Sequence, residues 1–129
     1  MSKIDFLKEQ IIEARTFVNR LMSELPEDLW YVIPERTDSN FIWQVGHLLV
    51  SQNFHTLTAV TGVNEKVGRL VPIQKYNRIF NGMGTLHRSI EKDLIPVAEL
   101  REQTEIVHQI CIENLETLND DVLAECLQP

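Results

Sequence analysis

The apolar positions of residues 3–25 recur every three or four residues, which is the spacing of one face of an α-helix. Ser2 and Asp5 have the spacing of a capping box at the start of this segment, and Pro26 follows its end. The pattern therefore predicts a long amphipathic helix over residues 3–25. Its apolar seam consists of Ile4, Leu7, Ile11, Ala14, Val18, Leu21 and Leu25.

A second segment, residues 39–61, contains no charged residue, and its apolar side chains cover nearly every side of a helical projection. Asp38 or Ser39 is expected to cap this helix, and Gly62 to end it. A helix that is apolar on most sides is buried on most sides. We therefore expect the central helix of a bundle, with one narrow polar strip made of Gln44, His47, Ser51, His55 and Thr58.

The segments between the periodic stretches have the composition of connections. Residues 26–38 contain two prolines and predict a short link with a helical turn at 27–31. Residues 63–95 mix glycine, proline and charge without a sustained period, which predicts a long crossover with one or two short helical turns. Helical periodicity returns from Pro96, expected as the first residue of a third long helix, and the polar residues 119–121 are expected to end that helix.

No segment alternates as a β-strand does, so the predicted fold class is all-α: an antiparallel bundle of three long helices with a crossover between the second and third. A length of 129 residues predicts a single domain over 1–129. Two neighbours cannot cover every apolar side of the central helix. We therefore expect an exposed face that is buried in a homodimer.

Composition narrows the classes of partner. The net charge is -7 and no basic stripe is present, which argues against nucleic-acid binding. The first ten residues alternate charge with apolar side chains and do not form a signal or transit peptide, so we expect a cytoplasmic protein. The uncharged segment 39–61 resembles a membrane span, but Gln44, His47 and Gln52 would lack partners in lipid, and we expect no contact with membranes.

His47 is the residue of the polar strip with the clearest chemical potential. Two interpretations remain open for it: a core histidine that is hydrogen-bonded to the backbone, or a metal ligand. His55 lies eight positions further on, roughly 12 Å along a helix axis, too far to share one ion with His47. We expect His55 to be a solvent-facing or capping residue. His87 and His108 form no HxxxH pair with any other histidine.

Other catalytic signatures are missing from the sequence. Cys111 and Cys126 have no CxxC spacing and are expected to be two reduced, unreactive thiols. The glycines match neither a phosphate-binding loop nor a nucleophile elbow. The acidic pairs at 27–28 and 120–121 lie beside helix ends, where capping or solvation explains them.

The stretch "SNFIWQVGHLL", preceded by "DLWYVIP" and followed near the end by "LETLNDDVL", resembles the DinB-like family, also called DinB/YfiT-like putative metalloenzymes. The resemblance implies a four-helix bundle with an up, up, down, down order and a long crossover. It also implies a site in which three histidines hold a divalent metal such as zinc or nickel, the first of them at the position of His47. The family's characterised members are thiol-dependent transferases or isomerases, so a low-molecular-weight thiol is an implied partner.

The sequence departs from this family at its end. It stops at Pro129, where the family's fourth helix would begin, and it lacks the HxxxH that supplies the other two histidines. A truncated chain, a shortened family member and a partner chain that supplies the missing face are all compatible with this pattern. Two functions therefore stay open: a metal-dependent thiol transferase or hydrolase in which Trp43 and Phe54 shape the pocket beside His47, or a non-catalytic bundle that self-associates or binds a small molecule.

Overall fold

The computed structural model describes residues 2–80, 88–92 and 94–122. Helix α1 spans Lys3–Glu24, close to the predicted range. Ser2 and Asp5 form the predicted capping box, in which the Ser2 hydroxyl accepts from the Asp5 amide at 3.1 Å. The start of α1 is also held by Asp120, whose carboxylate accepts from the backbone amides of Lys3 and Ile4.

The second helix consists of three consecutive segments: α2 (Phe41–Gln52), the π-helical η2 (Asn53–Thr58) and α3 (Ala59–Thr61). Gly62 ends it with φ 88°, a conformation that glycine adopts without steric cost. The prediction that Asp38 or Ser39 caps this helix is wrong. The cap is Asn40, whose side chain accepts from the Trp43 amide at 3.2 Å.

Asn40 is suited to this place because it both accepts and donates. Its side-chain oxygen also accepts from the Ile90 amide, and its side-chain nitrogen donates to the carbonyls of Tyr31 and Ile90. The side chains of Asp38 and Ser39 contain no amide group, so neither can donate to two carbonyls at once. Asn40 therefore joins the start of α2 to both connecting segments, from a position that is 2% exposed.

The connections contain the predicted short helices. The first holds the 3-10 helix η1 (Glu27–Tyr31), in which Trp30 is fully buried. The crossover holds α4 (Glu65–Leu70) and α5 (Ile73–Phe80). The third long helix, α6 (Val97–Glu116), begins one residue after Pro96, which is its N-cap rather than its first residue. The helix ends before the polar residues 119–121.

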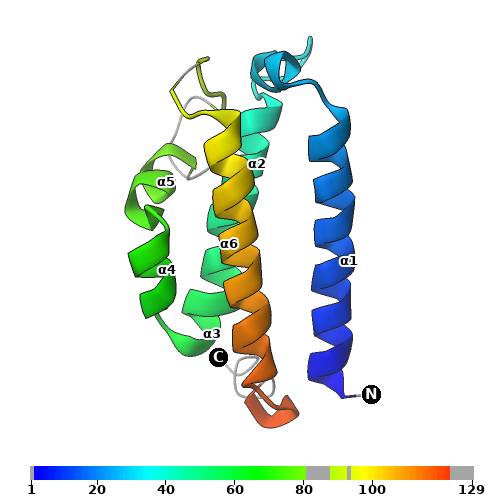
Figure 1. The fold of residues 1–129 in the computed structure, drawn as a ribbon, viewed down its shortest axis with the longest axis vertical. Coiled ribbons are helices and arrows are strands. Elements are labelled where there is room, and N and C mark those ends of the chain that lie inside the picture. The colour runs from blue at the N-terminus through cyan, green and yellow to red at the C-terminus, as the bar shows by residue number, and fades with distance from the viewer. Residues whose placement is uncertain (1, 81–87, 93, 123–129) are drawn as a thin grey trace.

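The long helices form an all-α bundle, as predicted, but the expected up, up, down, down order is wrong in one respect. Figure 1 shows α1 running up and both α2 and α6 running down. Side-chain contacts agree with this view: Lys8 pairs with Glu116 near one end of α1, and Arg15 reaches Thr104 further along. The short link through η1 reverses the chain, and the crossover through α4 and α5 then returns it before α6 begins.

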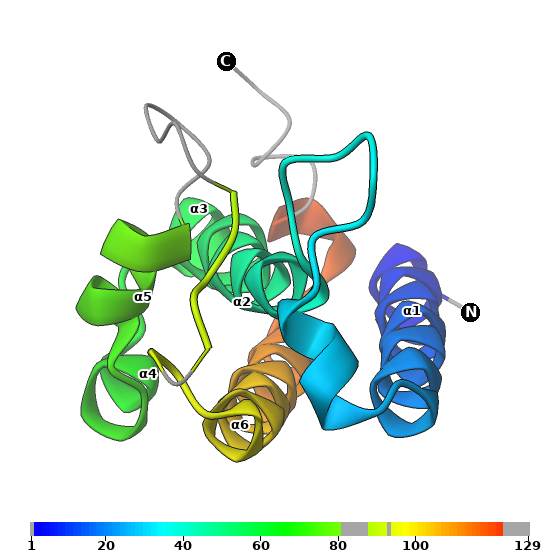
Figure 2. The ribbon, with the colours of Figure 1, turned by 90° about the horizontal axis from the view of Figure 1, so that it is seen from above.

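Helix α2 occupies the centre of the bundle. It packs against α6 on one side and against α5 on another, while α1 stands at the edge and touches mainly α6 (Figure 2). The fully buried side chains of the core come from α2, η2, α5, α6 and the connections, including Trp30, Ile42, Leu57, Tyr76, Phe80, Ile95 and Leu100. Along the described stretches, no helix is both long and apolar enough to cross a membrane.

Candidate functional site

His47 lies half-buried on α2. Its imidazole contacts the backbone at the end of α5. Its Nδ1 is 2.7 Å from the backbone carbonyl oxygen of Phe80 at the end of α5. A carbonyl oxygen only accepts, so Nδ1 carries the proton in this contact and the neutral ring keeps its lone pair on Nε2. A hydrogen bond from the second ring nitrogen to a carbonyl is the usual support of a metal-ligating histidine.

Gly46 explains how the Phe80 carbonyl comes so close. A Cβ atom on Gly46 would overlap the Phe80 ring, which is fully buried against α2 at this point. The absence of a side chain at Gly46 therefore allows the end of α5 to pack directly on α2. Gly46 thus leaves space for α5 to pack on α2, and His47 donates a hydrogen bond to the Phe80 carbonyl at the end of α5.

Trp43 fixes the other side of the imidazole. Its ring is nearly parallel to that of His47, with the centroids 4.8 Å apart and the planes 8° apart. Trp43 is 3% exposed, and among the described residues its buried indole N–H has no hydrogen-bond partner. Phe54 differs from the expected pocket wall, because it is 54% exposed and contacts the ring of His55 instead.

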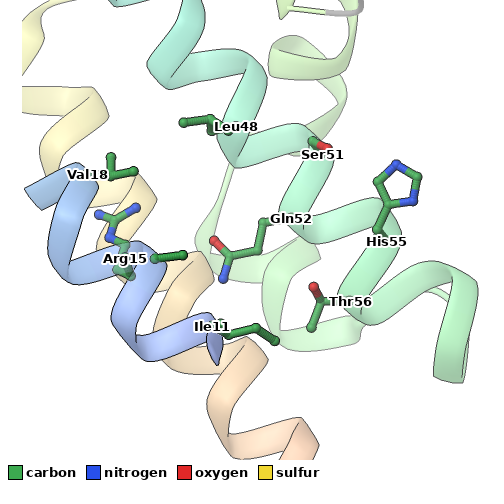
Figure 3. A pocket seen from close by; sticks show the side chains of 9 residues that line it. Ile11, Arg15, Val18, Leu48, Ser51, Gln52, His55 and Thr56 are labelled. Atoms are coloured by element: carbon green, nitrogen blue, oxygen red, sulfur yellow. The ribbon is translucent and has the colours of Figure 1, made fainter. Parts of the chain in front are cut away.

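His55 and His108 take separate positions. The predicted exposure of His55 is confirmed, and Figure 3 shows its ring pointing away from the space between α1 and α2. His108 is buried on α6, where its Nδ1 lies 3.3 Å from the side-chain nitrogen of Gln52. That nitrogen can only donate, so Nδ1 accepts and His108 is neutral. His87 lies outside the described residues.

A polar cluster around the buried side chains of Thr104 and His108 joins α1, α2 and α6, and sequence reasoning missed it. The Arg15 guanidinium donates to the Thr104 hydroxyl at 2.8 Å and lies 3.8 Å from the Glu105 carboxylate. Burial lowers the pKa of Arg15, and Glu105 only partly opposes this. Burial, followed by the positive charge of Arg15, also lowers the pKa of His108. The available signal was that Thr104 and His108 are polar residues one turn apart in the apolar seam of α6.

Arg15 of this cluster and the neighbouring Gln52 line a groove of about 270 Å³ between α1 and the second helix. Figure 3 shows Ile11 and Arg15 of α1 facing Leu48 and Gln52 of α2 across it. The walls of the groove are mostly apolar. Its lining residues are Ile11, Ala14, Arg15, Val18, Leu48, Ser51, Gln52, His55 and Thr56.

The described residues contain no group of three or more histidine, cysteine, aspartate or glutamate side chains with the geometry to hold a metal ion. His47 is thus suited to be one ligand, and further ligands have to come from elsewhere. Cys111 is no substitute, because it is fully buried and burial raises its pKa to about 12. Cys126 lies outside the described residues.

Comparison with known proteins gives one match. The model of a family described as the DinB superfamily matches residues 10–129, which is nearly the whole chain. No curated protein and no solved structure matches the chain. The matched range includes all of α2 with His47, the crossover and α6.

Proposed function

Because this chain belongs to the DinB superfamily, we propose that it is a divalent-metal protein in which His47 supplies one ligand through Nε2. The activity we propose is that of a thiol transferase or hydrolase, with zinc or nickel as the metal and a low-molecular-weight thiol as the co-substrate. A bound divalent ion would polarise a substrate oxygen and favour the thiolate form of such a thiol.

The observation that carries this proposal is the 2.7 Å contact between His47 Nδ1 and the Phe80 carbonyl. It selects the tautomer with a free Nε2, and the parallel Trp43 ring restricts rotation of the imidazole. The two restraints together orient Nε2 in a fixed direction, as a metal ligand requires.

The described residues fit a metal site only in part, because they supply one oriented imidazole and no set of three ligands. Catalytic metal sites generally use three protein ligands and keep one position open. The other ligands would have to come from residues outside the described ranges or from another chain. For this reason we assign His47, Trp43 and the Phe80 carbonyl to holding and orienting a ligand, and assign no chemical step.

The test is metal analysis of the purified protein together with two histidine variants. We expect near-stoichiometric zinc or nickel in the wild type, loss of most of it in His47→Ala, and retention in His55→Ala, which removes an exposed imidazole from the same helix. Reconstitution with Co²⁺ adds a spectroscopic measure of ligand number. Absence of bound metal from the wild type after incubation with each ion would refute the proposal.

The second function is a non-catalytic bundle that acts through self-association or small-molecule binding. The open groove between α1 and α2 favours it, since such a groove can be filled by a ligand or by another helix. In that case His47 is a core histidine whose hydrogen bond to Phe80 only joins α5 to α2. Equal metal content in the wild type and His47→Ala would support this function.

A further inference from the structure

The groove between α1 and the second helix combines one fixed charge with a mostly apolar surface. The charge is that of Arg15, and no aspartate, glutamate or lysine is among the nine described residues that line the groove. The apolar part of the wall consists of Ile11, Ala14 and Val18 of α1 and Leu48 of α2. A few polar groups on an otherwise apolar, concave surface are typical of a site for a small ligand.

The Arg15 guanidinium has unused hydrogen-bond donors. Its side chain is 10% exposed, so it has lost most of its water. Among the described residues, Nη2 donates to the neutral Thr104 hydroxyl, and neither Nη1 nor the buried Nε has a hydrogen-bond partner. The Glu105 carboxylate lies 3.8 Å away, beyond hydrogen-bond distance, and does not line the groove. A carboxylate in the groove would supply the charge-assisted hydrogen bonds that this cation lacks.

We propose that the groove binds a free monocarboxylate with a short aliphatic tail, its carboxylate on the Arg15 guanidinium and its tail between Val18 and Leu48. Figure 3 shows Val18 and Leu48 next to each other along the groove from Arg15 and Gln52. A volume of about 270 Å³ equals that of roughly nine water molecules at about 30 Å³ each, so the groove holds about nine non-hydrogen atoms. Heptanoate, with seven carbons and two oxygens, has the matching size.

The wall opposite Arg15 lies where the second helix changes from α2 to the π-helical η2. Gln52 is the last residue of α2, and Thr56 belongs to η2. Short π-helical segments inside α-helices are frequent at functional sites. The hydroxyls of Ser51 and Thr56 also line the groove and can donate to a carboxylate oxygen. The polar groups of both walls are therefore compatible with a bound carboxylate.

The first experiment titrates heptanoate and its uncharged analogue heptanamide into the EDTA-treated full chain at neutral pH, followed by NMR. We expect a dissociation constant of about 1 mM or lower for heptanoate, and binding of heptanamide about ten-fold weaker. Arg15→Met should weaken heptanoate about ten-fold and leave heptanamide unchanged, because only the charge is removed. Arg20→Met is the matched control, since Arg20 is an exposed cation of α1 outside the groove. Circular dichroism checks that each variant is folded.

Ala14→Leu tests the groove without removing the charge. Ala14 lines the groove at an exposed helical position, so leucine there fills the groove and suits the helix. We expect this variant to weaken both ligands about ten-fold. If Arg15→Met does not fold, this variant and the comparison of the two ligands in the wild type decide the matter.

Three results would overturn the proposal: no binding of heptanoate, equal binding of heptanoate and heptanamide by the wild type, or unchanged heptanoate binding in Ala14→Leu. The ligand class rests on the second function above, small-molecule binding, and is separate from the metal, since His47 does not line the groove. His47→Ala is therefore expected to bind heptanoate as the wild type does. Loss of binding in that variant would place the carboxylate at His47 and overturn the groove site, whereas a lack of bound metal refutes the metal function alone.

Discussion

The contact between Gly46 and Phe80 gives the sharpest test of how α5 is held on α2. In Gly46→Ala, the added methyl group would overlap the ring of Phe80, which is fully buried and cannot move without displacing α5. Overpacking of this kind costs about 1–3 kcal/mol. Alanine in place of glycine within a helix gains about 1 kcal/mol. We therefore expect Gly46→Ala to lower the free energy of unfolding by up to about 2 kcal/mol.

Gly68→Ala is the matched control for helix propensity. Gly68 lies within α4, and a Cβ atom there meets no other group within 4 Å. This variant keeps the gain without the overlap, so we expect it to stabilise the protein by about 0.5–1 kcal/mol. Urea unfolding followed by circular dichroism measures both values. Equal stability of the two variants would refute the reasoning.

A double variant locates the cause at Phe80. Phe80→Leu alone should cost stability because it leaves a cavity, but it should cost less in the Gly46→Ala background, where the smaller side chain makes room for the methyl group. Gly46→Ala should also disturb the contact between His47 and the Phe80 carbonyl. The nitrogen resonances of His47, measured by NMR, would report that change directly.

Three further predictions concern buried polar groups and the buried thiol. Asn40→Ala removes the cap of α2 and leaves the backbone groups of Ile90 without their buried partner, so we expect a loss of about 2–4 kcal/mol in urea unfolding; a change below about 0.5 kcal/mol would contradict the role of Asn40. The pKa of His108 is below its ordinary value of 6.5, so the unfolded chain binds a proton first as the pH falls, and the melting temperature should decrease below about pH 6.5; in His108→Gln this decrease should be smaller. Cys111, with its pKa raised to about 12 by burial, should resist alkylation in the native protein and react only after unfolding, which peptide mass spectrometry can follow separately from Cys126.

The sequence was sufficient to predict the long helices and their class. The three- and four-residue spacing of apolar positions depends only on local geometry, so α1 and α6 were placed within a residue or two of their observed ends. The lack of charge in residues 39–61 correctly placed the second helix at the centre of the bundle. Gly62 ends this helix as expected, because a positive φ is a local property of glycine.

Pairings between distant segments could not be predicted in this way. The cap of α2 is Asn40 because Ile90, 50 positions away, supplies both a donor and an acceptor for its amide. Sequence reasoning saw only that Asp38 and Ser39 are good local caps. The parallel direction of α1 and α2 that the family resemblance implied was also wrong, and helix periodicity could not correct it because it is the same in both directions of travel.

At the candidate site, too, the sequence identified a residue and the tertiary structure decided its contacts. The sequence identified His47 as the residue of interest but left its role open, because a helical position does not reveal the partner of a ring nitrogen. Only the packing of α5 brings the Phe80 carbonyl to Nδ1, and only the missing side chain of Gly46 permits that packing. Arg15 becomes a half-buried cation by facing Thr104 and Glu105 on α6. Local spacing determines which helices form, whereas burial and charge compensation depend on which helices become neighbours.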